Sequence, residues 1–304
     1  MDRQIVEVEK LQFNIAEQWV EISLPAKEGI EPLLPSFVPF VGKAPTGINM
    51  MCSLQVVYEN IDPDFSSIRL MDAIGVVGNR FRLLEMEKSY AVELQMVENR
   101  PWSRLVCNKY FTEGYAYVDI NNQHLGEILS AFMMVMFAQS AILHKMILIH
   151  ASVVMNDGIG YAFLGKSGTG KSTHSSLWLR YLESFELLND DNPAIRIGED
   201  GEVYVYGTPW SGKTPCYKNR KARLGGGLVR LEQAPANSFY RESGVTAILA
   251  LLPGCSSMRW NNKLYMSMVD ILEIIVRKVP VGRLKCLPNK EAALLCYSEL
   301  KRLN

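Results

Sequence analysis

The run Gly165-Lys166-Ser167-Gly168-Thr169-Gly170-Lys171-Ser172-Thr173 matches the pattern G-x-x-x-x-G-K-[ST] of a phosphate-binding loop. The sequence predicts an apolar strand over 161–164 and a helix from about 172 to 182. In such a turn backbone N–H groups converge where the helix N-terminus adds partial positive charge. The alternative is a chance match in a loop that caps a helix. Because the flanking elements are the expected ones, we interpret the run as a nucleotide site.

Two side chains of this loop have predicted roles in binding a triphosphate. The Lys171 ammonium would neutralise the β and γ phosphates, and the Ser172 hydroxyl would be a ligand of a bridging magnesium ion. The expected cofactors are therefore ATP and Mg²⁺. The predicted nucleotide-binding residues are Gly165, Ser167, Gly168, Thr169, Gly170, Lys171, Ser172 and Thr173.

Two adjacent carboxylates, Asp190 and Asp191, follow a strand predicted over 185–188. Carboxylates at the end of a strand suit a site in which one holds the metal and the other activates a phosphoryl acceptor. The surrounding residues are also turn formers, so an Asx turn before Pro193 is the structural alternative. With the phosphate loop upstream, the site interpretation is favoured.

Three further features are candidates for the same site. His150 ends an apolar strand, where it is either a core residue or a group that orients a carboxylate or phosphate. His174 lies in the first turn of the predicted helix and is expected to be structural. The segment 207–220 is rich in Gly, Pro and cations, and it is either a solvated hairpin or a loop that closes over the phosphates. Its cations are Lys213, Lys218 and Arg220.

The composition of the chain limits its partners and its location. With 304 residues, 48% of them hydrophobic, two domains are expected. The counts of Lys+Arg and Asp+Glu are both 32, so nucleic acid and anionic membrane surfaces are not expected partners. The start lacks a secretory signal pattern, and the six scattered cysteines lack metal spacing. We expect a cytoplasmic protein whose partners are a nucleotide and an unknown protein or small-molecule acceptor, with a homo-oligomer as an open alternative.

The longest apolar run extends from Ile128 to Leu143 and is interrupted by polar residues. It is shorter than the ~20 residues that span a bilayer. A helix buried between sheet layers is therefore predicted rather than a membrane span.

The predicted organisation has three parts: a mostly antiparallel β domain over 1–120, a buried connecting helix over 121–145, and a nucleotide-binding domain over 146–304. In the third part the loop strand follows an Asp-Gly turn, so its preceding neighbour is expected to be antiparallel. The fold class is α/β with α+β character and a mixed sheet. Near the C-terminus the sequence predicts a bulge or tight bend at 225–227, a strand over 246–252, a helix ended by Pro280 and a last helix capped by Asn289.

These motifs together resemble the HPr kinase/phosphorylase family, whose nucleotide-binding core is shared with ATP-dependent phosphoenolpyruvate carboxykinases. His150, the glycine-rich loop and Asp190-Asp191 carry the resemblance, which covers about 146–231. It implies that the histidine lies near the phosphates. It further implies that Asp190 is the general acid/base and that Asp191 acts with Ser172 at magnesium.

The expected function is that of an ATP-dependent phosphotransferase in which Asp190 takes a proton from a hydroxyl of a protein serine or a small metabolite. The N-terminal half does not resemble that of the bifunctional bacterial enzymes, so the acceptor stays open. Carboxykinase-like chemistry and a non-catalytic, nucleotide-gated binding protein are the alternatives; the presence of both carboxylates argues against the latter. The candidate catalytic residues are Asp190, Lys171, His150 and Lys213.

Overall fold

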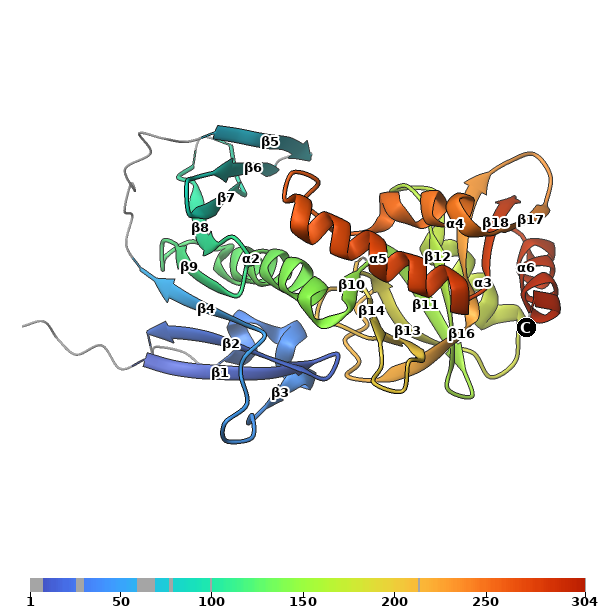
Figure 1. Ribbon diagram of the computed structural model, residues 1–304, viewed down its shortest axis with the longest axis horizontal. Coiled ribbons are helices and arrows are strands. Elements are labelled where there is room, and N and C mark those ends of the chain that lie inside the picture. The colour runs from blue at the N-terminus through green and yellow to red at the C-terminus, as the bar shows by residue number, and fades with distance from the viewer. Residues whose placement is uncertain are drawn as a thin grey trace, which may run out of the picture. The chain divides into compact units, whose positions relative to one another are not determined.

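The computed structural model describes residues 8–25, 30–58, 69–76, 79–98, 100–212 and 214–303. The chain divides into two compact units, Met1–Ser140 and Ala141–Asn304, each with its own mixed β-sheet (Figure 1). The expected mixed α/β class is confirmed. The division falls within the segment 121–145, and its helix belongs to the first unit instead of forming a separate connector.

The sheet of the first unit is antiparallel except where β4 (Cys52–Val57) pairs with β2 (Gln18–Pro25) and β9 (Glu113–Tyr117). The first two strands were not predicted, although apolar residues alternate at 11, 13 and 15 and again at 20, 22 and 24. In spatial order the strands are β3 (Val41–Gly42), β1 (Val8–Ile15), β2 (Gln18–Pro25), β4 (Cys52–Val57), β9 (Glu113–Tyr117), β8 (Ser103–Asn108), β7 (Ser89–Gln95), β6 (Asn79–Glu85) and β5 (Arg69–Val76).

Helix α2 (Leu125–Ser140) packs on β4 and β9 of that sheet. A Cβ on Gly114 would lie 2.8 Å from the Met136 sulfur, so glycine permits this close approach. The first unit also contains the short helices α1 (Ile30–Leu33) and η1 (Pro35–Phe40). Together with η2 (Ala141–His144), α2 covers 125–144, within the predicted 121–145, and passes a length-and-hydropathy test for a membrane span. However, 67% of its tested window is buried inside the protein, as in a core helix.

In the sheet of the second unit, β12 (Ile159–Leu164) lies between an antiparallel β11 (Ala151–Asn156) and a parallel β16 (Lys221–Gln233). The predicted antiparallel neighbour of the loop strand is thereby confirmed. The long β16 also pairs with β18 (Val281–Cys286), which in turn pairs with β17 (Ser238–Glu242). The other strands lie in the order β10 (Met146–Leu148), β14 (Ala194–Ile197), β15 (Val203–Tyr206), β16 (Lys221–Gln233), β12 (Ile159–Leu164), β11 (Ala151–Asn156) and β13 (Glu186–Asp191).

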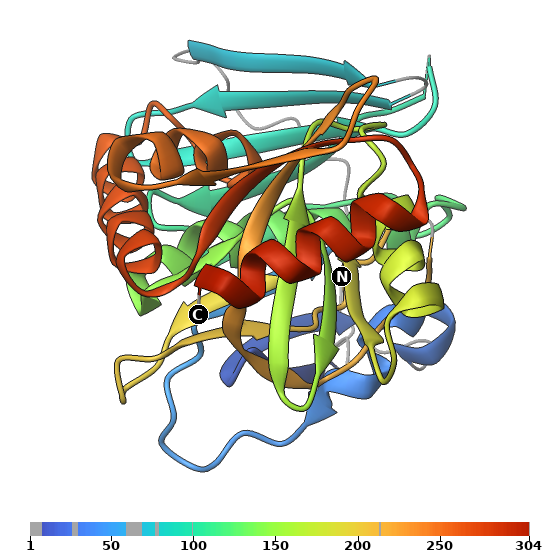
Figure 2. The same ribbon diagram turned by 90° about the vertical axis from the view of Figure 1, so that its right-hand side faces the viewer.

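Helices cover both faces of this second sheet. Helices α3 (Lys171–Tyr181) and α6 (Lys290–Leu303) contact each other on one face, where Figure 2 shows α6 lying across the strands. Helices α4 (Gly244–Leu251) and α5 (Asn262–Lys278) contact each other on the opposite face, with η3 (Leu252–Gly254) after α4. Asn289 caps α6 as predicted, because its Oδ1 accepts a hydrogen bond from the Ala292 N–H at 3.0 Å.

The predicted strand over 246–252 is wrong, because this segment forms α4 and the start of η3. The run is apolar throughout, so it lacks a clear polar and apolar periodicity that would distinguish a strand from a helix. The deciding signal is local. The Ser243 N–H donates to the Thr246 hydroxyl at 3.3 Å, as in a capping box.

The glycine run of β16 is a bulge, as predicted. The register against β12 moves from Ile159↔Arg223 to Tyr161↔Gly227, so β16 has extra residues at this point. Gly227 has φ +121°, and a Cβ on Gly226 would lie 2.4 Å from the Tyr161 ring. Side chains at these two positions would therefore prevent β16 from pairing with the loop strand.

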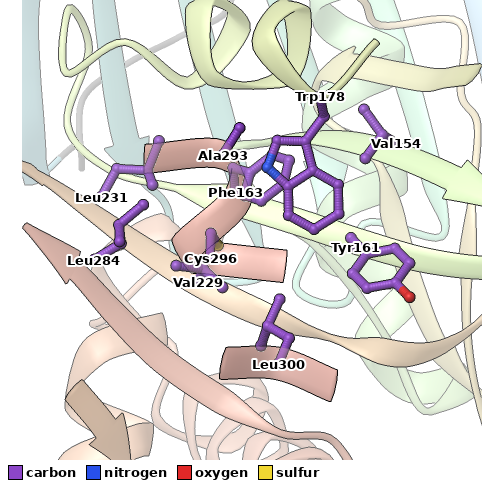
Figure 3. Packing of buried hydrophobic residues seen from close by; sticks show 10 residues of the cluster. All are labelled: Val154, Tyr161, Phe163, Trp178, Val229, Leu231, Leu284, Ala293, Cys296 and Leu300. Carbon is purple, nitrogen blue, oxygen red and sulfur yellow. The ribbon is translucent and has the colours of Figure 1, made fainter. Parts of the chain in front are cut away.

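Trp178 of α3 occupies the centre of the core between the sheet and α6 (Figure 3). It is fully buried, and its ring lies 5.0 Å from the rings of Tyr161 and Phe163. The indole N–H donates to His174 Nε2 at 3.0 Å. Burial lowers the pKa of His174 from 6.5 to about 4, so this histidine is a neutral core residue, as expected.

We predict that His174 makes folding stability depend on pH between about 6.5 and 4. In this window the unfolded chain binds a proton that the folded chain excludes, so stability falls as the pH falls, by about 3 kcal/mol over the whole range. The His174→Gln variant keeps an acceptor for the indole but has no such titration. Urea unfolding of both proteins at several pH values measures the difference in slope. The same slope in parent and variant would contradict the prediction, and His124→Gln is the control.

Candidate functional site

The glycine-rich loop joins the end of β12 to the start of α3, as predicted. Gly168 and Gly170 have φ of +78° and +103°, which explains why glycine occupies both positions. The Thr169 N–H and hydroxyl both donate to the Lys166 carbonyl, at 3.1 and 2.6 Å. These contacts fold residues 165–170 into a tight turn at the N-terminus of a helix.

The Lys171 side chain folds back over this turn, and its Nζ donates to the Gly165 carbonyl at 3.3 Å. Burial lowers the pKa of Lys171, and the carboxylates of Asp191 and Asp190 oppose that shift. The ammonium group is thus a largely buried cation that lies within the electrostatic range of both aspartates. An additional anion in the turn would compensate part of its desolvation.

The Asp190 carboxylate lies against the first turn of α3. Ser172 Oγ donates to Asp190 Oδ1 at 2.9 Å, and Asp190 is only 3% exposed. The residue belongs to β13, where it pairs with Ser152 of β11, so the predicted alternative of an Asx turn does not describe it. Within the described ranges no group of three or more His, Cys, Asp or Glu residues gathers in the manner of a metal cluster.

The Asp191 carboxylate has different partners. His150 Nε2 lies 3.0 Å from Asp191 Oδ1, and Asn192 Nδ2 donates to Asp191 Oδ2 at 2.8 Å. The side chains of His150 and Asp191 are 40% and 36% exposed, so this pair is open to solvent. The structure therefore joins Ser172 to Asp190 and His150 to Asp191, whereas the resemblance implied that Ser172 acts with Asp191.

His150 reaches Asp191 because it lies in the break between β10 and β11, just after the first of these strands ends. β10 pairs with β14, while β11 pairs with β12 and β13. At the break the Ile149 N–H donates to the Pro193 carbonyl at 3.1 Å and the His150 N–H to the Gly254 carbonyl at 2.7 Å. These two bonds hold the histidine beside the end of β13.

Residues 207–212 and 214–220, here called the strap, run along the outer edge of β13. Lys213, predicted as catalytic, lies outside the described residues. The Gly212 N–H donates to the Asp190 carbonyl at 2.5 Å, and Asn192 N–H donates to the Trp210 carbonyl at 3.3 Å. A Cβ on Gly212 would lie 3.0 Å from the Asp190 carbonyl oxygen. The strap thus fixes the backbone of the two aspartates from the side opposite β11.

Two cationic side chains of the strap, Lys218 and Arg220, bind Glu186 of β13 and not the glycine-rich loop. Lys218 Nζ donates to Glu186 Oε2 at 2.9 Å, and Arg220 Nη1 donates to both oxygens of Glu186 at 2.8 Å. Lys218 also donates to the Leu187 carbonyl at 2.6 Å. These contacts dock the strap on β13, so neither side chain extends toward the glycine-rich loop in this structure.

An apolar cleft of about 500 Å³ opens on the α3 side of the loop. The one titratable base among the lining residues is His174, which is neutral at ordinary pH. None of the lining side chains therefore has a charge. A neutral planar group would fit such a lining. The lining residues are Gly168, Thr169, Gly170, Thr173, His174, Leu177, Leu231, Gln233, Ala234, Cys286, Leu287 and Pro288.

No protein family model matches the chain, and no curated protein matches it. Among solved structures, the chain is similar to the HPr(Ser) kinase/phosphatase from Coxiella burnetii. The two are 14% identical, the alignment covers 51% of this chain and 89% of that chain, and the TM-score is 0.32. A likeness at this level assigns neither a family nor an activity to the chain.

We predict that Glu186→Ala loosens the strap. Removing the partner of Lys218 and Arg220 should raise the rate of trypsin cleavage after these residues by about two- to fivefold, the scale of an exposed ion pair. Mass spectrometry of timed digests measures it, with Glu199→Ala as the control on an exposed turn. Equal cleavage of parent and variant would show that the ion pairs do not hold the strap.

Proposed function

We propose that this protein is a phosphotransferase that moves the terminal phosphoryl group of Mg-ATP to a hydroxyl acceptor. One observation carries the proposal: the Ser172 hydroxyl and the Asp190 carboxylate are bonded below a glycine-rich turn, and a second, more exposed carboxylate, Asp191, lies beside them with His150. A site that only binds nucleotide needs the first pair but not the second. The combination supplies both a cation site and a proton acceptor.

In this proposal the glycine-rich loop binds the phosphates of the nucleotide, and the apolar cleft binds its base. The phosphates would lie in the turn at 165–170, where the helix N-terminus and the Lys171 ammonium provide positive charge. The base would enter the adjoining apolar cleft, past Thr173 and Leu177. A neutral, apolar lining of this kind can hold a purine base, because the base itself has no charge that needs a charged partner.

The donor set at Ser172 and Asp190 fits magnesium. Mg²⁺ takes oxygen ligands at about 2.0–2.1 Å in octahedral geometry, so two neighbouring ligands lie about 2.9 Å apart. Ser172 Oγ and Asp190 Oδ1 are 2.9 Å apart. When bound, the cation would neutralise charge on the phosphate oxygens. Two protein ligands suffice, because phosphate and water oxygens fill the other positions of such sites.

Proton transfer is assigned to Asp191 in this mechanism. Its carboxylate accepts the proton of the acceptor hydroxyl while the acceptor oxygen forms a bond to the terminal phosphorus. The bond from that phosphorus to the bridging oxygen breaks, and ADP leaves. His150 and Asn192 hold the carboxylate in one orientation from its two oxygens. Asp190 is less suitable as the base, because it is buried and already bound to Ser172.

We predict that Lys171→Ala weakens Mg-ATP binding by at least about tenfold, since it removes a charge-assisted contact to phosphate. The fold should stay intact, because the ammonium lies over the loop and not in the apolar core. Isothermal titration calorimetry measures the affinity, with the exposed Lys278→Ala as the control. An unchanged affinity and enthalpy in Lys171→Ala would refute the phosphate-loop assignment.

We predict that substitution of the two aspartates impairs different steps, Mg²⁺ binding for Asp190 and phosphate transfer for Asp191. Asp190→Asn should raise the Mg²⁺ concentration needed for nucleotide binding, because an amide is a poorer ligand for a hard cation. Asp191→Asn should bind Mg-ATP like the parent but transfer phosphate about 10²–10⁴-fold more slowly, the scale of a lost general base. Transfer of label from γ-labelled ATP to a fractionated lysate measures turnover, and Asp270→Asn is the control.

The reverse pattern would restore the assignment implied by the resemblance, with Asp190 as the base. Parental behaviour of both variants would leave only a structural role for the pair. Product analysis with oxaloacetate instead of lysate tests the carboxykinase alternative, which would yield phosphoenolpyruvate.

A further inference from the structure

A second cleft, of about 410 Å³, opens on the other flank of the glycine-rich loop. It shares Gly168, Thr169, Leu231 and Gln233 with the apolar cleft. It extends from these residues to the start of the loop and to Arg230 and Glu232, whereas the apolar cleft extends to α3 and to the segment after β18. The lining is polar. Its residues are Lys166, Ser167, Gly168, Thr169, Arg230, Leu231, Glu232 and Gln233.

The strand register places Arg230 at this cleft. Arg230 pairs with Leu164, the last residue of β12, so it lies level with the start of the loop. Leu231 points into the core with α3 and α6, and therefore Arg230 points to the opposite face. There its Nη1 donates to the Ala250 carbonyl of α4 at 3.4 Å.

The Arg230 guanidinium keeps most of its binding capacity. Among the described residues, the Ala250 carbonyl is the one hydrogen-bond acceptor of its five N–H groups. Its side chain is 26% exposed. A guanidinium in this state, on a rigid strand and at the wall of a cleft, can hold an oxyanion with two parallel hydrogen bonds.

The charges around the cleft favour an anion. Glu232 is the lining carboxylate, against two lining cations, Lys166 and Arg230. Its Oε1 lies 3.8 Å from Arg230 Nε and 3.9 Å from Arg283 Nε, so two guanidinium groups share it. Arg283 also forms an ion pair with Glu242. The cleft wall therefore has more positive than negative charge.

We infer that this cleft is an anion subsite in which Arg230, helped by Lys166, binds a phosphate or carboxylate group. The inference rests on the proposed function and deepens it. The apolar cleft adjoins the last residues of the loop and the polar cleft adjoins the first, so phosphates in the loop would lie between a nucleoside and this second anion. Two groups could supply this anion: the terminal phosphate of the nucleotide and an anionic group on the acceptor.

The test compares Arg230→Gln and Arg230→Lys with Arg223→Gln, a control at the far end of the same strand that is paired with Glu202. Thermal melts first establish that each variant is folded. Calorimetry then measures Mg-ADP, the non-hydrolysable analogue Mg-AMPPNP, and inorganic phosphate added to protein saturated with Mg-AMPPNP. We expect Arg230→Gln to weaken at least one anion by about tenfold or more, with a smaller effect for Arg230→Lys and none for Arg223→Gln.

The arms of this experiment separate the two sources. Loss of AMPPNP affinity with unchanged ADP affinity identifies the terminal phosphate as the occupant. Loss of inorganic phosphate binding with unchanged nucleotide affinity identifies a group of the acceptor. Unchanged binding of all three ligands in folded Arg230→Gln overturns the subsite, even where the parent binds Mg-ATP through Lys171. Absence of Mg-nucleotide binding by the parent itself would instead refute the proposed function.

Discussion

The hydrogen bond between Ser172 and Asp190 connects the two elements on which the whole site depends. It joins the first turn of α3 to the end of β13, an edge strand that is otherwise held by β11 and the strap. A carboxylate that is 3% exposed needs such a partner, because an unpaired buried charge is costly. Lys171 lies close enough to oppose the same charge. The geometry of the loop and of the carboxylates is therefore one coupled arrangement.

The two aspartates are neighbours in sequence but meet different environments, because successive side chains of a strand point to opposite faces. Asp190 faces α3 and is buried. Asp191 lies beside His150, at a position open to solvent. This difference in exposure is the physical basis for separating a cation ligand from a proton acceptor. A metal ligand benefits from a fixed, enclosed position, whereas a base must reach the substrate.

Both clefts beside the loop depend on the parallel pairing of β12 with β16 and of β16 with β18. Parallel strands bring their carboxyl ends to one edge of the sheet. The apolar cleft forms where the ends of β16 and β18 meet α3, and the polar cleft forms where β16 meets the loop itself. The bulge at Gly226 and Gly227 sets the register that brings Arg230 level with Leu164.

The sequence by itself determined the features that a few consecutive residues encode: the glycine-rich turn and its helix, the Asp-Gly hairpin, the bulge at 225–227 and the cap at Asn289. Turns, caps and bulges depend on local backbone energetics, so a short motif identifies them. Only the tertiary structure decided which aspartate pairs with Ser172 and which with His150, and that Glu186 holds the strap cations. It also decided that Arg230 reaches the loop. These outcomes depend on strand register and on contacts between residues far apart in the chain, and a uniformly apolar or charged segment has no local pattern that specifies its partner.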